Sequence, residues 1–130
     1  MGGRMKVCKI FEWDAAHHLT LPYDSPCQSV HGHHYLIELE IEGSIDENGL
    51  VVDFKMLKEN INDDVSFDHK DINVLYGFDD MNQNPTAENI VIWLKPHIDH
   101  CLKSRFIGKK LKVSRIRVWE TPTSFAEEEW

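Results

Sequence analysis

The sequence of 130 residues has no apolar run that approaches the roughly 18 residues of a membrane-spanning helix. It also has no block of basic residues, and 22 acidic side chains against 14 basic ones give a formal net charge of −8. An acidic chain without a basic patch is poorly suited to bind the phosphate backbone of a nucleic acid. We therefore expect neither a membrane nor a nucleic acid among its partners. A small anionic substrate would need a locally positive pocket.

Cysteine is scarce and its number is odd, because the chain has only Cys8, Cys27 and Cys101, which cannot form a complete disulfide framework. The first residues lack the apolar segment of a signal peptide. These two absences predict a cytoplasmic protein with reduced thiols. Repeats, low-complexity tracts and linkers are also absent, and the apolar fraction of 42% is ordinary for a globular protein. We therefore expect a single domain over residues 1–130.

Hydrophobic alternation predicts the strands. The clearest strand begins at His33, where apolar residues at odd positions through Ile41 alternate with Glu38, Glu40 and Glu42. Such a pattern is typical of a strand that is buried on one face only. The other expected strands are Met5–Trp13, Leu111–Glu120 and a short final one, Ser124–Trp130.

Apolar residues at helical spacing predict two helices. Asp53 is the expected N-cap of the first helix, over residues 54–65. In the second helix we expect Pro85 at the first helical position, and Pro96 either kinks the helix or ends it just before that residue. Strands grouped outside a pair of helices indicate an α+β fold with an antiparallel sheet.

Polar stretches predict loops and turns. Residues 19–30 and the polar segment 63–84 are expected to be loops, and Asn48-Gly49 predicts a turn. In the strand Leu111–Glu120 the apolar parity changes near Ser114. This change indicates a β-bulge or a strand that is covered on both faces.

Histidine is abundant, with eight residues, and His31 and His33 lie at the start of the clearest strand. Side chains two residues apart on a strand point to the same face, and Gly32 between them leaves room for another backbone or a ligand. His17 or His18, just after the first strand, can add a third imidazole if the two strands are antiparallel neighbours. Three neutral imidazoles leave one coordination position open, as a catalytic zinc site requires. The alternative is that these are polar loop histidines.

Four further residues carry chemistry whose role the pattern alone leaves open. Cys27, four residues before His31, suits a catalytic base or nucleophile, a fourth zinc ligand, or a small buried hydrophobe. Asp68 beside His69 can orient the tautomer of that imidazole for proton transfer, although adjacent side chains often face apart. Glu120 ends its strand on the inward parity, where a carboxylate either binds a hydrogen-bonding ligand or reaches solvent.

Several short motifs together resemble those of the 6-pyruvoyltetrahydropterin synthase / 6-carboxytetrahydropterin synthase family. The resemblance extends from about Val7 to Thr123, nearly the whole chain. Each motif alone is modest, whereas all of them in order and at family spacing are specific. The resemblance assigns the first zinc ligand to His17 rather than His18. The motifs are Asp14–Leu19 (DAAHHL), Cys27–His33 (CQSVHGH), Val52–Phe54 (VDF), Phe67–Asn73 (FDHKDIN), Asn84–Asn89 (NPTAEN) and Trp119–Pro122 (WETP).

The resemblance implies a tunnelling fold, in which an antiparallel sheet carries two helices on one face and the sheets of several subunits join into a barrel. The implied assembly is a homo-oligomer, usually a dimer of trimers, with active sites between subunits. Glu120 of one chain can then serve the zinc of another. The implied substrate is 7,8-dihydroneopterin triphosphate, whose side-chain hydroxyls would be bound and acidified by Zn²⁺. The implied zinc ligands are His17, His31 and His33.

The resemblance also implies roles for the remaining candidates. Cys27 would be the base at the side-chain carbon of the substrate, and His69, oriented by Asp68, would move protons on the other side. Glu120 would accept two parallel hydrogen bonds from the 2-amino and ring N–H edge of the pterin. The other implied substrate-binding residues are Thr86 and Thr121.

The spacing between Cys27 and His31 separates two branches of the family. Animal pyruvoyl enzymes have a longer insertion there, whereas three residues separate the two here, as in bacterial enzymes of the queuosine pathway. This resemblance favours 6-carboxytetrahydropterin synthase, a carbon–carbon lyase that releases acetaldehyde and triphosphate. The alternative is 6-pyruvoyltetrahydropterin synthase, a phosphorus–oxygen lyase that eliminates triphosphate. An alternative of another class is a non-enzymatic zinc-binding module, in which Cys27 binds the metal and Glu120 has no role.

Overall fold

A five-stranded sheet forms the centre of the computed structural model, which describes residues 3–75, 77–79, 81 and 83–130. Its strands are β1 (Arg4–His17), β2 (His31–Ser44), β3 (Lys70–Asp71), β4 (Lys112–Thr121) and β5 (Ser124–Glu129). They lie in the order β3-β1-β2-β4-β5. The four long strands pair antiparallel, and the short β3 runs parallel to the end of β1.

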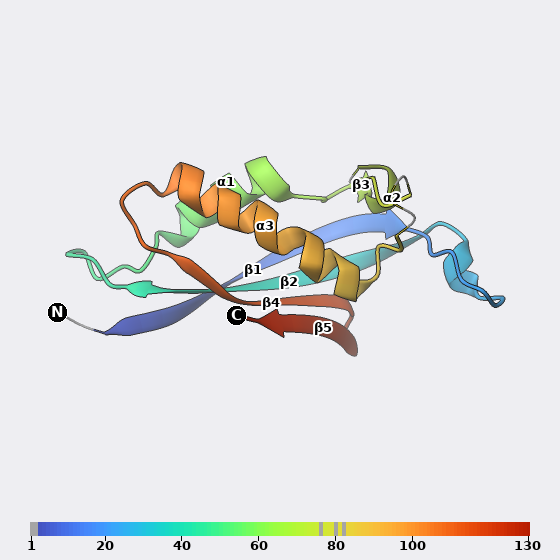
Figure 1. The fold of residues 1–130 in the computed structure, drawn as a ribbon, viewed down its shortest axis with the longest axis horizontal. Coiled ribbons are helices and arrows are strands. Elements are labelled where there is room, and N and C mark those ends of the chain that lie inside the picture. The colour runs from blue at the N-terminus through green and yellow to red at the C-terminus, as the bar shows by residue number, and fades with distance from the viewer. Residues whose placement is uncertain (1–2, 76, 80, 82) are drawn as a thin grey trace.

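Two long helices cover one face of this sheet. They are α1 (Phe54–Val65) and α3 (Ala87–Arg105), which lie side by side across the strands in Figure 1. The core lies between the two layers, where side chains such as Tyr35 and Leu39 of the sheet meet Leu57 and Leu94 of the helices. The α+β fold, with two helices on one face of a largely antiparallel sheet, is therefore confirmed.

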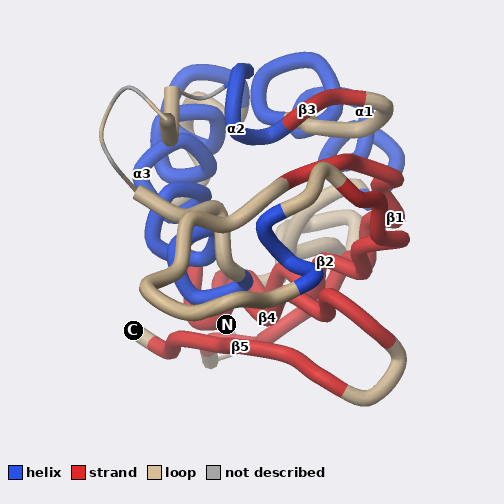
Figure 2. Tube along the Cα trace, turned by 90° about the vertical axis from the view of Figure 1, so that its right-hand side faces the viewer, coloured by secondary structure: helices blue, strands red, loops and turns tan. Residues whose placement is uncertain are grey.

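One end of the sheet collects the short elements. Figure 2 looks at this end, where β1 finishes and β2 begins. The short elements there are the 3₁₀ turn η1 (Pro26–Gln28), β3 and α2 (Ile72–Leu75). The first turn of α3 and the turn between β4 and β5 reach the same end (Figure 1). Four separate parts of the chain thus meet at one end of the sheet.

The start of each long helix is fixed by a side-chain cap. Asp53 Oδ1 accepts hydrogen bonds from the N–H groups of Lys55 and Met56, so the predicted N-cap of α1 is confirmed. The prediction that Pro85 occupies the first position of α3 is wrong. Thr86 is the N-cap, because its hydroxyl accepts the Asn89 N–H at 3.1 Å, and Pro85 precedes it.

Pro96 does not end α3, which continues to Arg105. A proline inside a helix costs about 3 kcal/mol or more, partly through the lost hydrogen bond to the carbonyl four residues earlier. Here that carbonyl belongs to Ile92, an exposed residue whose oxygen can turn to water. Beyond the proline, Ile98 and Leu102 are buried in the core. Full burial of such side chains contributes about 1.5–3 kcal/mol each, which offsets the cost.

The expectation that residues 63–84 form a loop is wrong in part. β3 and α2 lie within this stretch. Phe67 and Ile72 are fully buried there, so tertiary packing orders elements that are too short to show a periodicity. The predicted irregularity in β4 is confirmed as a bulge, since Arg115 pairs with Glu40 while Val113 pairs with the next residue, Ile41.

The turn predicted at Asn48-Gly49 is confirmed. Gly49 adopts a φ of +82°, which glycine tolerates at little cost, and Asp46 accepts the N–H groups of Asn48 and Leu50. β1 and β2 are each longer than expected, because β1 continues to His17 and β2 already begins at His31.

Within the described residues, every helix is too short or too polar to cross a membrane.

Candidate metal centre

Three histidines converge at the end of the β1–β2 pair. His17 is the last residue of β1 and lies directly opposite His31, the first residue of β2, while His33 follows two residues later on the same face. The Nε2 atoms of His17 and His31 are 3.0 Å apart. One ring nitrogen of each of the three residues lies within 4.8 Å of the others. The structure thus brings together the three residues that the sequence singled out as metal ligands, and they could hold a metal ion.

Backbone carbonyls fix the orientation of two of these rings. His17 Nδ1 lies 2.8 Å from the carbonyl oxygen of Pro85, and His31 Nδ1 lies 2.7 Å from that of Ser29. A carbonyl can only accept, so each Nδ1 carries the proton and each Nε2 presents a lone pair. The hydroxyl of Tyr35, which is completely buried, lies 3.1 Å from His17 Nδ1. The tautomers needed for metal binding through Nε2 are therefore set by the fold.

This donor set fits a cation. Two lone pairs directed at one another across 3.0 Å repel unless a proton or a positive ion lies between them. Burial, the largest cause, lowers the pKa of His17 and of His33, and the neighbouring imidazoles act in the same direction. Both side chains are thus neutral near pH 7, the protonation state that a metal ligand needs.

Glu120 brings a carboxylate to the same point. Its Oε1 lies 3.3 Å from His17 Nε2 and 3.6 Å from His33 Nε2. The side chain of Glu120 is half-buried on the inward face of β4, which is one of the two orientations left open by the sequence. The carboxylate opposes the effect of burial, since it raises the pKa of both imidazoles. Within one chain, Glu120 therefore faces the histidines of that same chain.

A cavity of about 490 Å³ opens beside Glu120. β2 and β4 are paired only up to Leu36 and Trp119, and beyond this pair the two strands separate. The cavity occupies the place where they part. Its walls are largely apolar, and the Glu120 carboxylate lies among them. The residues that line it are Gly32, His33, His34, Leu36, Trp119, Glu120, Thr121 and Pro122.

Asp68 and His69 form a second polar group beside β1. Asp68 Oδ2 lies 3.1 Å from His69 Nδ1, so the two adjacent side chains do meet. Asp14 holds both residues through its backbone, donating its N–H to Asp68 Oδ1 at 2.8 Å and accepting the His69 N–H at 2.6 Å. The hydrogen bond from the Asp14 N–H is the main reason that the pKa of Asp68 is lowered. His69 adopts a left-handed φ of +59° and is largely exposed.

Cys27 lies in η1, in the connection from β1 to β2, and is partly buried. Its carbonyl oxygen accepts the Leu19 N–H at 2.8 Å. Among the described residues, no hydrogen bond or ion pair joins Cys27 to Asp68 or His69. One chain therefore presents Cys27 and the Asp68–His69 pair as separate groups.

The two threonines singled out by the resemblance are found at element ends. Thr86 caps α3, and its hydroxyl proton stays available to a ligand because the oxygen acts there as an acceptor. Thr121 ends β4, and its hydroxyl oxygen accepts the Thr123 N–H at 3.3 Å. Residues that sequence reasoning did not single out are Tyr35 and Pro85, which contact His17, and Asn73 and Asn84, which bind the chain just after it. Both asparagines lie inside motifs quoted above, and this is the only feature of the sequence by which they could have been identified.

Comparison with known proteins places the chain among pterin enzymes. Residues 6–129 match the family model described as 6-pyruvoyl tetrahydropterin synthase. A putative 6-carboxy-5,6,7,8-tetrahydropterin synthase of Archaeoglobus fulgidus is 37% identical over 118 residues, covering 88% of this chain and 87% of that protein. The 6-carboxy-5,6,7,8-tetrahydropterin synthase of Rickettsia felis is 32% identical over 143 residues, covering 95% of this chain and 99% of that protein.

The fold agrees with this result. The solved structure of Caenorhabditis elegans 6-pyruvoyl tetrahydropterin synthase superimposes with a TM-score of 0.78 at 19% identity, covering 98% of this chain and 96% of that one. The tunnelling fold expected for the single chain is thereby confirmed, whereas the barrel across subunits stays a prediction. With a family match over nearly its whole length, the chain belongs to the 6-pyruvoyl tetrahydropterin synthase family of enzymes.

Proposed function

We propose that this protein converts 7,8-dihydroneopterin triphosphate to 6-carboxy-5,6,7,8-tetrahydropterin, with release of acetaldehyde and triphosphate, in queuosine biosynthesis. The observation that carries the proposal is the convergence of three oriented imidazoles beside the Glu120 carboxylate, at the edge of a cavity. The curated relatives named 6-carboxy-5,6,7,8-tetrahydropterin synthase, at 30–33% identity over nearly the whole chain, support this product.

The proposed cofactor is one Zn²⁺ per chain, held by His17, His31 and His33. Neutral imidazoles at near-tetrahedral sites are ligands that zinc prefers, and three of them leave a position for substrate. When bound, zinc supplies Lewis-acid stabilisation to oxygen atoms that become negative during the reaction. The carbonyls of Pro85 and Ser29 support this assignment, because they hold two of the rings with Nε2 toward the common centre.

Glu120 is the proposed anchor for the pterin ring. A carboxylate can accept two parallel N–H bonds from the 2-amino and ring N–H groups, and such charge-assisted pairs fix orientation as well as affinity. Its place between the histidines and the cavity supports a substrate that spans both. Thr121 follows Glu120 at the cavity, and Thr86 retains a hydroxyl proton for donation. Both are proposed to bind the substrate.

The proposed proton transfers use Cys27 and the Asp68–His69 pair. Cys27 removes a proton from the side-chain carbon next to the ring, and His69 returns protons to the pterin. Asp68 Oδ2, 3.1 Å from His69 Nδ1, favours the tautomer with its proton on Nδ1, which leaves Nε2 for transfer. Because one chain presents these groups separately, we propose that active sites are completed between subunits.

The free edges of the sheet support such an assembly. β3 pairs only with Ala15 and Ala16, so most of the outer edge of β1 has no strand partner among the described residues. β5 is the opposite edge and pairs only with β4. Strand edges that lack a partner favour joining of sheets from different subunits, and we propose a homo-oligomer, a dimer of trimers.

A product assay tests the proposed function. Zinc-loaded protein is incubated with 7,8-dihydroneopterin triphosphate, released aldehyde is trapped, and triphosphate is quantified. We expect acetaldehyde and triphosphate in equal amounts, together with 6-carboxytetrahydropterin. Triphosphate without acetaldehyde, alongside a pyruvoyl product, would replace the proposal by the 6-pyruvoyltetrahydropterin synthase reaction. Zinc binding without any turnover would favour the non-enzymatic module.

A further inference from the structure

Two asparagine side chains hold the chain where it leaves the candidate metal centre. Asn73 Oδ1 accepts the His18 N–H at 2.9 Å, and its Nδ2 donates to the His18 carbonyl at 3.0 Å. Asn84 does the same two residues later, accepting the Thr20 N–H at 2.7 Å and donating to the Thr20 carbonyl at 2.9 Å. Each amide thus presents the donor and the acceptor that a neighbouring strand would offer.

The opposite side of this segment binds Cys27. Between the two clamped residues, Leu19 donates its N–H to the Cys27 carbonyl at 2.8 Å. Backbone groups of an extended chain alternate in direction, so residues 18 and 20 face the asparagines while residue 19 faces η1. Residues 18–20 therefore run between two asparagines on one side and Cys27 on the other.

The clamps are tied to the metal centre as well. Asn84 precedes Pro85, whose carbonyl oxygen lies 2.8 Å from His17 Nδ1. The carbonyl of Asn84 accepts the Asn89 Nδ2–H at 2.8 Å, which fixes Asn84 to the first turn of α3. The start of α3 consequently holds both the His17 ring and the backbone of Thr20.

The Asn73 side chain is buried, and each of its polar atoms is hydrogen-bonded. It is 2% exposed, and its second Nδ2 proton goes to Asp79 Oδ1 at 2.9 Å. The cost of burying a side-chain amide is offset only when its hydrogen bonds are made, as they are here. Asp79 also contacts the histidine that follows His17. His18 Nε2 lies 3.5 Å from Asp79 Oδ1, and His18 is not part of the group formed by the three converging imidazoles.

We propose that Asn73 and Asn84 are positioning residues that set the place of Cys27 relative to the three histidines. This inference rests on the proposed function, in which Cys27 acts as the base. The histidines themselves are aligned by the β1–β2 register, so the asparagines govern the connection to Cys27 rather than the metal ligands. A displacement of about 1 Å at a reacting group can lower a rate roughly 100-fold.

Asn84→Asp tests the inference with the smallest change of shape. The variant keeps an acceptor for the Thr20 N–H but sets a carboxylate oxygen against the Thr20 carbonyl, so one of the two bonds becomes a repulsion. Asn73→Asp is the parallel variant at His18. Asn48→Asp, in the exposed turn before α1, is the control with the same change of charge. The measurements are zinc per chain, kcat, KM and the rate at which iodoacetamide alkylates Cys27, with exposed Cys8 in the same sample as reference.

In Asn84→Asp we expect zinc at the level of the control, little change in KM, and a kcat lower by roughly 10- to 100-fold. Alkylation of Cys27 relative to Cys8 should rise several-fold, because the segment that carries its hydrogen bond is released. If alkylation rises but the native protein does not turn over the pterin, the positioning contact stands and the proposed function fails. Alkylation and kcat equal to those of the control would overturn the inference, and so would loss of zinc in both asparagine variants.

Discussion

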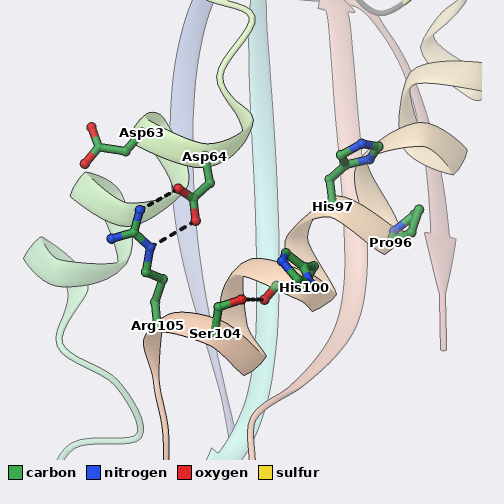
Figure 3. A pocket seen from close by; sticks show the side chains of 7 residues that line it. All are labelled: Asp63, Asp64, Pro96, His97, His100, Ser104 and Arg105. Atoms are coloured by element: carbon green, nitrogen blue, oxygen red, sulfur yellow. Dashed lines mark hydrogen bonds and ion pairs between the residues drawn. The ribbon is translucent and has the colours of Figure 1, made fainter.

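Two of the places where the described residues bring histidines near carboxylates differ in the direction of their ligand atoms. At the end of the sheet, His17, His31 and His33 direct one ring nitrogen each toward a common point. Between α1 and α3, a cleft of about 720 Å³ is lined by a comparable set of side chains (Figure 3). Its polar lining residues are Asp63, Asp64, His97, His100, Ser104 and Arg105.

Several polar side chains of the helical cleft are bound to partners other than a common centre. Arg105 reaches from α3 to α1 and donates from Nε and Nη2 to the two oxygens of Asp64, at 3.2 and 2.7 Å (Figure 3). His97 Nδ1 lies 2.8 Å from the carbonyl oxygen of Trp93, and the two rings stack with centroids 4.1 Å apart. Their ring nitrogens and carboxylates do not converge.

The difference teaches that the direction of lone pairs, rather than the kinds of residue, makes a metal site. Backbone carbonyls hold Nδ1 of His17 and His31, and the strand register turns Nε2 of both rings toward one centre. In the cleft, by contrast, the Asp64 carboxylate is already bound by Arg105 and the His97 ring lies against Trp93. Five predictions test this comparison.

The largest effect is expected from removing a converging imidazole. His33→Ala should lose nearly all bound zinc and with it turnover, because two imidazoles are too few for a stable site. His97→Ala, which removes the same side chain from the cleft, should keep one zinc per chain. Metal analysis after dialysis measures both.

The same measurement tests which histidines belong to the site. His18→Ala and His34→Ala should retain zinc, since His18 pairs with Asp79, and His34 Nδ1 lies 2.6 Å from Asp14 Oδ1. Loss of zinc in His18→Ala with retention in His17→Ala would overturn the proposed ligand set.

Cys27→Ala separates chemistry from metal binding at the same end of the sheet. Zinc should stay at one ion per chain, while turnover falls by roughly 10²–10⁴-fold, the usual contribution of a general base. Cys101→Ala is the control, because this buried thiol packs in α3 and faces the core. Loss of zinc from Cys27→Ala would place the thiol among the metal ligands.

Glu120→Gln tests whether the carboxylate beside the histidines serves the substrate or the metal. The change keeps the shape and removes the charge, so the pterin N–H groups lose a charge-assisted partner. Such a bond contributes about 1.5–3 kcal/mol, and substrate should bind roughly 10- to 150-fold more weakly while zinc is retained. Titration of the zinc-loaded variant measures this, with Glu47→Gln in an exposed turn as control. Unchanged affinity, or loss of zinc, would remove Glu120 from its proposed role.

Much of this site could be predicted from sequence because its geometry is local. His31 and His33 share a face through the two-residue period of a strand, and the antiparallel neighbour places His17 directly opposite His31. The carboxyl at the end of β4 followed from the same parity argument. These predictions needed a strand pattern and one assumption about which strands are neighbours, whereas the choice of His17 over His18 came from the family resemblance.

The remainder depends on contacts that no local pattern contains. Asn73 and Asn84 bind backbone that is 55 and 64 residues away in sequence, and a solvent-exposed asparagine would look the same in the sequence. The short elements β3 and α2 are held in place by the burial of Phe67, which precedes β3, and of Ile72, the first residue of α2. Pro96 was misleading for the same reason, since the core contacts of the helix beyond it outweigh the local preference of the proline.

The smallest effect is expected in the helical cleft, where Asp64→Asn removes one side of the ion pair with Arg105. Hydrogen bonding from Arg105, and next from the Cys101 thiol, lowers the pKa of Asp64 in the folded protein. A carboxyl whose pKa is lower in the folded than in the unfolded state stabilises the fold above its unfolded pKa of about 3.9, and this contribution is lost as the pH falls through the folded value. The melting temperature of metal-free Asp64→Asn should therefore lie slightly below that of the native chain at pH 6, and the difference should close below about pH 4. Asp63→Asn, which removes the neighbouring exposed carboxylate, is the control, and a difference for Asp64→Asn that is independent of pH would mean that shape rather than charge holds the two helices together here.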